Sequence, residues 1–96
     1  MAFDIDDLKM TALHWASRAG FAEFVSILTT KYRANVLAKD IYGRTPLHLA
    51  VAKKHTECII RLFIEGGKLT SLNNAKESVR SVAPDVYTKF LLEKLE

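Results

Sequence analysis

The sequence predicts an all-α repeat solenoid, a stack of helix–turn–helix units, and three observations lead to this fold class. First, one short pattern occurs twice: residues 11–16 read Thr-Ala-Leu-His-Trp-Ala, and residues 45–50 read Thr-Pro-Leu-His-Leu-Ala, 34 positions later. A pattern that returns at such a period is typical of repeat proteins. Second, each copy begins with a threonine that can cap the first turn of a helix. Third, each copy is followed by a segment with apolar residues at helical spacing.

The first unit should contain two helices joined by a tight link. We expect the first helix over residues 12–18 and the second over residues 22–31, with Ala19-Gly20 folding the second back on the first. Glycine suits such a link because it adopts positive φ without strain. The second helix has an apolar face at positions i, i+1 and i+4, formed by Phe24, Val25 and Leu28.

The second unit should begin at Thr45 and have the same design. Pro46 falls in the first turn of a helix that reaches about Lys53, and a missing N–H does no harm there. A second helix should follow over residues 56–65 and end at Gly66-Gly67. Its buried stripe consists of Ile59, Leu62 and Phe63, and Ile60 and Ile64 add a second row. Such a wide apolar face suits a helix that lies between neighbouring layers.

Residues 78–96 indicate a degenerate third unit. Ser78 stands 33 positions after Thr45 and can still cap a helix, but Pro84-Asp85 follows soon afterwards and shortens the link. We expect a last helix over residues 85–94 and interpret the segment as a C-terminal cap with a polar outer face. On the buried side we expect Val86, Phe90, Leu91 and Leu95, and on the opposite side Lys89, Glu93 and Lys94.

The repeated pattern resembles the T-P-L-H-x-A start of the ankyrin repeat, a family with a period of about 33 residues. Residues 45–50 match every specified position, and residues 11–16 have alanine in place of proline. Residues 34–44 are similar to the β-hairpin finger of this family, so the resemblance implies short hairpin fingers between the helix pairs. It divides a single domain, residues 1–96, into a partial finger over 4–10, repeats over 11–44 and 45–77, and a degenerate capping repeat over 78–96.

Length and composition indicate one ordinary globular domain. The 96 residues are 49% hydrophobic and 26% charged. The net charge of +3 comes from lysines and arginines scattered among acids, without the basic block that predicts nucleic-acid binding. No apolar run is long enough to span a bilayer, and the acidic start lacks the pattern of a signal peptide. Because Cys58 is the one cysteine, no internal disulfide can form, and we expect a cytoplasmic or nuclear protein.

No pattern in the sequence predicts a catalytic, cofactor or metal site. The histidines of the repeated pattern, His14 and His48, lie one period apart, and the resemblance implies that they form structural hydrogen bonds between loops and adjacent repeats. His55 and Cys58 have helical spacing, but zinc needs three or four ligands. The acidic residues near the start lack the glycine and glutamate of a calcium loop. Gly66-Gly67-Lys68 ends a helix, whereas a phosphate loop opens one.

The resemblance places the function on the surface. In ankyrin arrays the finger tips and the exposed side of the first helices form a concave face that usually binds a protein. Ile41 and Tyr42 are adjacent at an expected tip, where they would bury nothing in the free monomer, and tyrosine and arginine are favoured at interface hot spots. Carried over position by position, the face comprises Asp7, Leu8, Met10, Arg18, Ala19, Ile41, Tyr42, Arg44, Ala52 and Lys53.

These observations predict a non-catalytic protein–protein interaction module. Its partner would be another protein of unknown identity, and we expect no direct contact with nucleic acid or a membrane. Two alternatives use the same face. One is a regulatory subunit or inhibitor that occludes a partner enzyme, and the other is the ankyrin subunit of a transcription-factor complex, because residues 6–16 also resemble one repeat of such a subunit. The charged residues of the face could instead be solvated variable positions of a repeat.

No dedicated cap is visible at the N-terminal end of the predicted stack. Leu13, Trp15, Phe21 and Phe24 could leave apolar surface uncovered there, although we expect Trp15 to pack between layers, with a partly exposed edge as the alternative. We therefore expect one of three properties: marginal stability, self-association through this end, or membership of a longer array.

Overall fold

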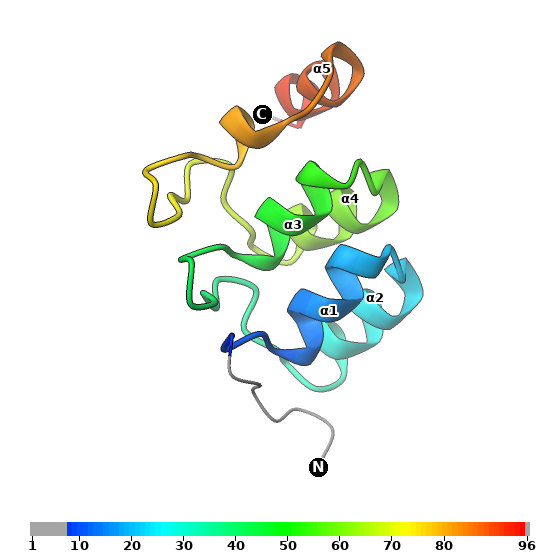
Figure 1. Ribbon diagram of the computed structural model, residues 1–96. Helices are drawn as coiled ribbons and strands as arrows, with labels where there is room; N and C mark the ends of the chain where they lie inside the picture. Colours follow the sequence, from blue (N-terminus) through cyan, green and yellow to red (C-terminus); the bar gives the residue numbers. More distant parts are fainter. Residues whose placement is uncertain (1–7, 96) are drawn as a thin grey trace.

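Five α-helices and one short 3₁₀ helix form the regular structure of residues 8–95, the part of the chain that this computed structural model describes (Figure 1). Each predicted α-helix is present, with ends within one residue of those expected. None of the helices in these residues is long and apolar enough to cross a membrane. In chain order they are α1 (Ala12–Ala19), α2 (Ala22–Thr30), α3 (Pro46–Ala52), α4 (Thr56–Ile64), η1 (Arg80–Val82) and α5 (Val86–Lys94).

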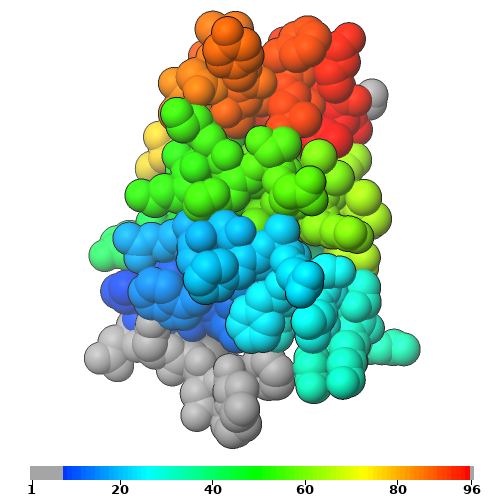
Figure 2. Space-filling model, turned by 90° about the vertical axis from the view of Figure 1, so that its right-hand side faces the viewer, coloured from blue at the N-terminus to red at the C-terminus, as the bar shows by residue number. Residues whose placement is uncertain are grey.

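The helices form layers that are stacked in sequence order. Helices α1 and α2 pack as a pair, α3 and α4 form the next pair, and α1 lies against α3 while α2 lies against α4. The third layer contains η1, which packs against α3, and α5 (Figure 1). Figure 2 shows the same order from the side, with the α1–α2 layer at one end and the α5 layer at the other. The predicted all-α solenoid is therefore confirmed.

The first helix of each pair begins in the same way. The backbone N–H of His14 donates to the Thr11 hydroxyl, and the N–H of Thr11 donates to Nδ1 of His14. Thr45 and His48 form the same reciprocal pair one period later. Each pair satisfies two N–H groups that the start of a helix would otherwise leave without partners. The predicted threonine caps are confirmed, with histidine as the second member of the capping box.

Residues with a left-handed backbone recur at the same period as the helices. They occupy three positions of the repeat: the finger tip, the link between paired helices, and the end of the second helix. Non-glycine residues adopt positive φ rarely, so their recurrence shows that the repeated fold imposes this conformation. The residues and their φ angles are Lys9 (59°), Gly43 (77°) and Lys76 (64°) at the tips, Gly20 (85°) and Lys54 (62°) in the links, and Arg33 (52°) and Gly66 (108°) after the second helices.

The core runs without a break within the helix pairs and from one layer to the next. Leu13 and Leu47, from the two copies of the repeated pattern, are each 1% exposed, and Val25, Ile59 and Leu62 from the second helices are 0% exposed. All five belong to one buried cluster that continues into the third layer. Burying apolar surface against a neighbouring layer is what stabilises a unit too small to have a core of its own.

The fingers and α5 differ from the sequence-based expectations. The resemblance implied β-hairpin fingers, but in the described residues the fingers are tight turns without paired strands. The β-pairing in these residues is one isolated antiparallel bridge, between Leu72 and Ser78. Helix α5 has apolar residues on both sides, so its pattern did not determine which side is buried. Val86 and Phe90, expected to be buried, are 77% and 56% exposed. The packed side consists of Thr88, Leu91, Leu92 and Leu95.

Candidate protein-binding surface

The second finger, residues 38–44, is held together by the carboxylate of Asp40, which is 5% exposed. Its Oδ1 accepts hydrogen bonds from the backbone N–H groups of Tyr42 and Arg44, both at 2.9 Å. Its Oδ2 accepts from Nε of Arg44 at 2.7 Å. The Gly43 N–H donates to the Asp40 carbonyl and closes the turn. One buried side chain thus fixes the backbone of the finger tip, a role that the sequence analysis missed and that its position at the start of an Asx turn could have indicated.

The third finger uses an amide for the same purpose. Asn73 stands 33 positions after Asp40, and its Oδ1 accepts from the backbone N–H groups of Ala75 and Glu77, both at 2.9 Å. Its Nδ2 donates to Oε1 of Glu77, which takes the place of Arg44. Both turns therefore use a side-chain oxygen, of Asp40 or Asn73, as the acceptor for backbone N–H groups. The residue four positions later suits the other atom of that side chain: Arg44 donates to the second carboxylate oxygen of Asp40, and Glu77 accepts from the amide nitrogen of Asn73.

Backbone hydrogen bonds join each finger to the next one. The N–H of Ile41 donates to the carbonyl of Leu8 at 2.8 Å, and the N–H of Asn74 donates to the carbonyl of Tyr42 at 2.8 Å. The side-chain amide of Asn74 also donates to the carbonyl of Ile41 at 2.9 Å. These bonds run along the stack, so the finger tips form one continuous edge beside the helices (Figure 1).

Apolar and aromatic side chains project from the second finger tip. Ile41 is 47% exposed and Tyr42 is 54% exposed. The guanidinium of Arg44 lies 5.0 Å from the centre of the Tyr42 ring, so it packs on the tyrosine while Nε binds Asp40. The tip thus combines a fixed backbone with an exposed aromatic ring and a partly exposed cation.

The helices contribute a shallow hollow of about 400 Å³ beside the ends of α1 and α3. Trp15, Arg18 and Ala19 of α1 line one side of it, and Lys53, which caps α3, lines the other. The guanidinium of Arg18 lies 5.5 Å from the centre of the Trp15 ring. Trp15 is 44% exposed, so the alternative of a partly exposed ring holds and the expected burial between layers was wrong. The hollow therefore offers two cations around an aromatic surface.

Both ring nitrogens of each histidine in the repeated pattern form hydrogen bonds inside the stack. Nδ1 of His14 accepts from the Thr11 N–H, so the ring proton resides on Nε2, which donates to the carbonyl of Arg44 at 2.8 Å. His48 repeats this arrangement, and its Nε2 donates to the carbonyl of Glu77 at 3.1 Å. Each ring is at most 2% exposed and ties a helix start to the finger that follows it. The two rings act in successive layers and do not converge on a shared ligand.

A family model of ankyrin repeats, in three copies, matches residues 2–75. The chain belongs to the ankyrin repeat family. Inversin from Canis lupus familiaris is 36% identical to it over 75 residues, which are 76% of this chain and 7% of inversin. Ankyrin repeat domain-containing protein 29 from Danio rerio is 32% identical over 69 residues, or 72% of this chain and 23% of that protein. Rabankyrin-5 from Mus musculus is 44% identical over 54 residues, or 56% of this chain and 4% of its own length.

Ankyrin repeats are generally protein–protein interaction modules. The chain spans less than a quarter of the length of these relatives.

The structure places most residues of the predicted binding face at the surface of the ankyrin stack. Met10 is the exception: it is 1% exposed and belongs to the core, so the prediction that it lies on the binding face was wrong. Its place directly before a helix cap gave no sign of burial. Asp7 lies outside the described residues. Those exposed to solvent are Leu8 (38%), Arg18, Ala19, Ile41, Tyr42, Ala52 and Lys53, and Arg44 is partly exposed.

His55 and Cys58 both take part in the packing of this ankyrin repeat. Nε2 of His55 lies 2.9 Å from the carbonyl of Arg18, which ties the link of the second repeat to the end of α1. Cys58 is 0% exposed, and this burial raises the pKa of its thiol. The described residues contain no cluster of three or more potential metal ligands. His55 therefore links the two repeats, and Cys58 is a buried residue of the core.

Mild acid should destabilise the ankyrin stack through its buried histidines. Burial lowers the pKa of His14 and His48 below the ordinary value of 6.5. Between the folded and the unfolded pKa the unfolded chain binds more protons, so stability is complete above about pH 6.5 and falls as the pH drops below it. We expect a lower melting temperature at about pH 5.5 than at about pH 7.5, measured by circular dichroism.

Glutamine provides the control for this pH dependence. The double variant His14→Gln/His48→Gln keeps a capping side chain at the third helical position and cannot titrate. Its melting temperature should vary less between these two pH values than that of the parent chain. An equally steep dependence in the double variant would show that other groups are responsible.

Proposed function

We propose that this ankyrin domain is a non-catalytic module that docks a folded protein partner on its finger tips and on the exposed side of α1 and α3. The observation that carries the proposal is the pair Ile41 and Tyr42, two large side chains about half exposed on a backbone that Asp40 holds in place. A surface fixed before binding loses little conformational entropy when the partner arrives. The contact residues would be Leu8, Trp15, Arg18, Ile41, Tyr42, Arg44, Ala52 and Lys53.

Two kinds of contact support this assignment. Tyr42 stacked beneath Arg44 offers an aromatic anchor with a cation on one face, and both residue types are enriched in interface hot spots. The hollow near Trp15 offers a second apolar contact rimmed by Arg18 and Lys53. No described carboxylate forms an ion pair with either of these two cations, which leaves them for the partner.

Replacing Tyr42 by alanine should weaken the complex without altering the fold. The expected loss is about 2 kcal/mol, or roughly thirtyfold in Kd, if the ring is a hot spot. The folded state should be unaffected because the turn depends on the backbone N–H of Tyr42 and on Asp40, which the substitution retains. The partner would be captured from cell lysate on the immobilised chain, identified by mass spectrometry, and titrated against both proteins by calorimetry.

Tyr87→Ala is the matched control, because Tyr87 is an exposed tyrosine (86%) on α5, away from the proposed face. It should bind the captured partner as the parent chain does. The assignment fails if Tyr42→Ala binds with unchanged affinity, or if Tyr87→Ala weakens binding as much.

A further inference from the structure

The outer side of the first layer has the residues of a stacking face. Trp15 and Leu49 occupy the same position of the repeat, 34 residues apart, and are 44% and 5% exposed. Phe24 and Cys58 form a second such pair, 46% and 0% exposed. The members from the second repeat are buried in a layer on which α1 and α2 pack. The exposed members thus mark the same kind of surface without a layer on it.

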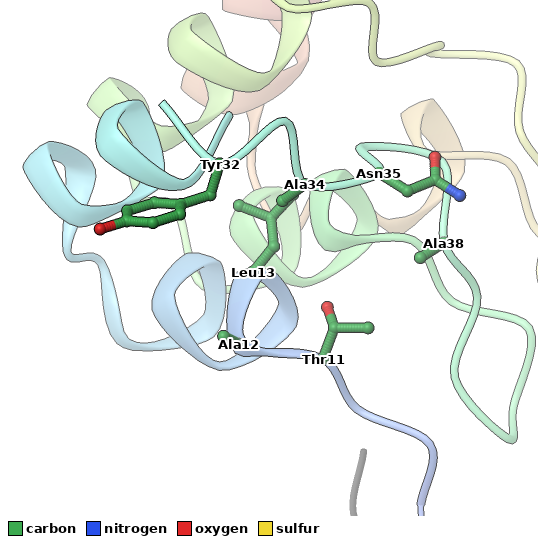
Figure 3. A pocket seen from close by; sticks show the side chains of 7 residues that line it. All are labelled: Thr11, Ala12, Leu13, Tyr32, Ala34, Asn35 and Ala38. Atoms are coloured by element: carbon green, nitrogen blue, oxygen red, sulfur yellow. The ribbon is translucent and has the colours of Figure 1, made fainter. Parts of the chain in front are cut away.

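A hollow of about 230 Å³ lies on the first repeat. Its lining is mostly apolar and includes Leu13, Ala34 and Ala38, with Tyr32 at one edge (Figure 3). Tyr32 is itself 52% exposed. Leu13 is the counterpart of Leu47, which lies in the interface between layers. The hollow therefore gives this end of the stack a shaped apolar surface, into which a projecting side chain can fit.

The opposite end of the stack has projecting apolar side chains. In α5, Thr88 and Leu92 are 6% and 1% exposed and Leu92 belongs to the core cluster, whereas Val86 and Phe90 are 77% and 56% exposed. Residues two positions apart in a helix lie roughly 200° apart around its axis. Val86 and Phe90 therefore lie on the side of α5 away from its buried residues. Helix α5 itself lies at the end of the stack opposite α1 and α2 (Figure 1). The outer side of α5 thus combines these apolar side chains with the exposed Lys89, Glu93 and Lys94, and Nζ of Lys94 lies 5.0 Å from the centre of the Phe90 ring.

We propose that two copies of this chain associate head to tail, with the outer side of α5 of one copy on the outer side of α1 and α2 of the next. The partner is a second copy because one chain carries both surfaces, each in the orientation that continues the stack. Within the chain, α1 already packs on α3 and α2 on α4, so one layer lies on the next in the same direction along the stack. A head-to-tail contact of this kind does not close on itself, so further copies can add to either end.

Light scattering of the full chain over a range of concentrations tests this proposal. The average mass should rise above that of one chain as the concentration increases, without a plateau at two copies. Phe24→Glu places a charge on one surface and Phe90→Glu places a charge on the other, so each variant alone should lose the larger species. Mixed together, the two variants retain one intact surface each and should form pairs of one copy of each, with about twice the mass of a single chain.

Ile64→Glu is the matched control, because Ile64 is 64% exposed on α4 of the middle layer, away from both ends. It should associate as the parent chain does, and thermal melts should show that all variants are folded. A parent mass that stays at one chain throughout would overturn the proposal. So would a stable dimer of Phe90→Glu alone, which would indicate a symmetric contact through the first layer, or a mixture that fails to pair. Trp15 is the one residue named for both surfaces, and neither Phe24 nor Phe90 belongs to the proposed partner-binding face. Failure of this proposal therefore leaves the test at Tyr42 unaffected.

Discussion

Replacing Asp40 by alanine should lower the free energy of unfolding by about 3 kcal/mol. The substitution leaves the backbone N–H groups of Tyr42 and Arg44 without their acceptor and removes the partner of the Arg44 side chain. The loss extends beyond one turn, because the same finger donates to Leu8 and accepts from Asn74. Urea unfolding followed by circular dichroism measures the change, and we expect a lower midpoint with an unchanged slope.

The third finger supplies the controls for this prediction. Asp40→Asn keeps the acceptor oxygen but sets an amide N–H₂ against the Arg44 guanidinium, so the expected loss is smaller, about 1–2 kcal/mol. Asp40→Asn/Arg44→Glu transfers the Asn73–Glu77 pair to the second finger and should recover part of that loss. The role given to Asp40 is wrong if the alanine variant unfolds at the same urea concentration as the parent chain. It is also wrong if the double variant is less stable than Asp40→Asn.

Local sequence signals were sufficient to predict the helices. Thr11 and Thr45 act only on the turn that follows them, and capping of this kind can be recognised from neighbouring residues. Pro46 and Gly20 likewise act through their own backbone. Because these signals recur after one period, each copy supports the interpretation of the other, and the expected ends of the α-helices agree with the structure to within one residue.

Properties that depend on the neighbouring layer were harder to predict. Met10 and Leu8 are both apolar residues of the first finger, yet one is 1% and the other 38% exposed, and no periodicity of the sequence separates them. Helix α5 has two apolar sides, and the choice between them depends on how the shortened third unit lies on the second. Trp15 and Leu49 share one position of the repeat, but their burial differs because only Leu49 has a layer on that side.

Apart from Arg44, which takes part in both, the side chains that hold the fingers together are distinct from those proposed to bind. Asp40, His14 and His48 direct their polar atoms to backbone groups of the stack and are nearly inaccessible. Ile41 and Tyr42 contribute backbone bonds to that frame while their side chains remain in solvent. Substitutions at the tips can therefore change which partner is bound at little cost in stability, which is how a repeat fold can carry many specificities.

Replacing Gly43 by alanine should lower the free energy of unfolding by about 2–3 kcal/mol. Part of this loss comes from the backbone, since Gly43 has a φ of 77°, where a Cβ is strained. The larger part comes from contact with the third finger. A Cβ at residue 43 would lie 2.7 Å from the backbone nitrogen of Asn74 and would also collide with its side chain. The third finger must then move, and the 2.8 Å bond from the Asn74 N–H to the Tyr42 carbonyl is lost.

Lys76→Gly separates these two contributions. Lys76 occupies the same position of the next finger, with a φ of 64°, and is exposed to solvent. The change tests the left-handed backbone alone and should alter stability by no more than about 1 kcal/mol, with relief of strain offset by the greater freedom of glycine in the unfolded chain. Both variants would be compared with the parent chain by urea unfolding. If Gly43→Ala costs no more than about 1 kcal/mol, the strain at φ is a sufficient explanation and the close contact between the fingers adds nothing to stability.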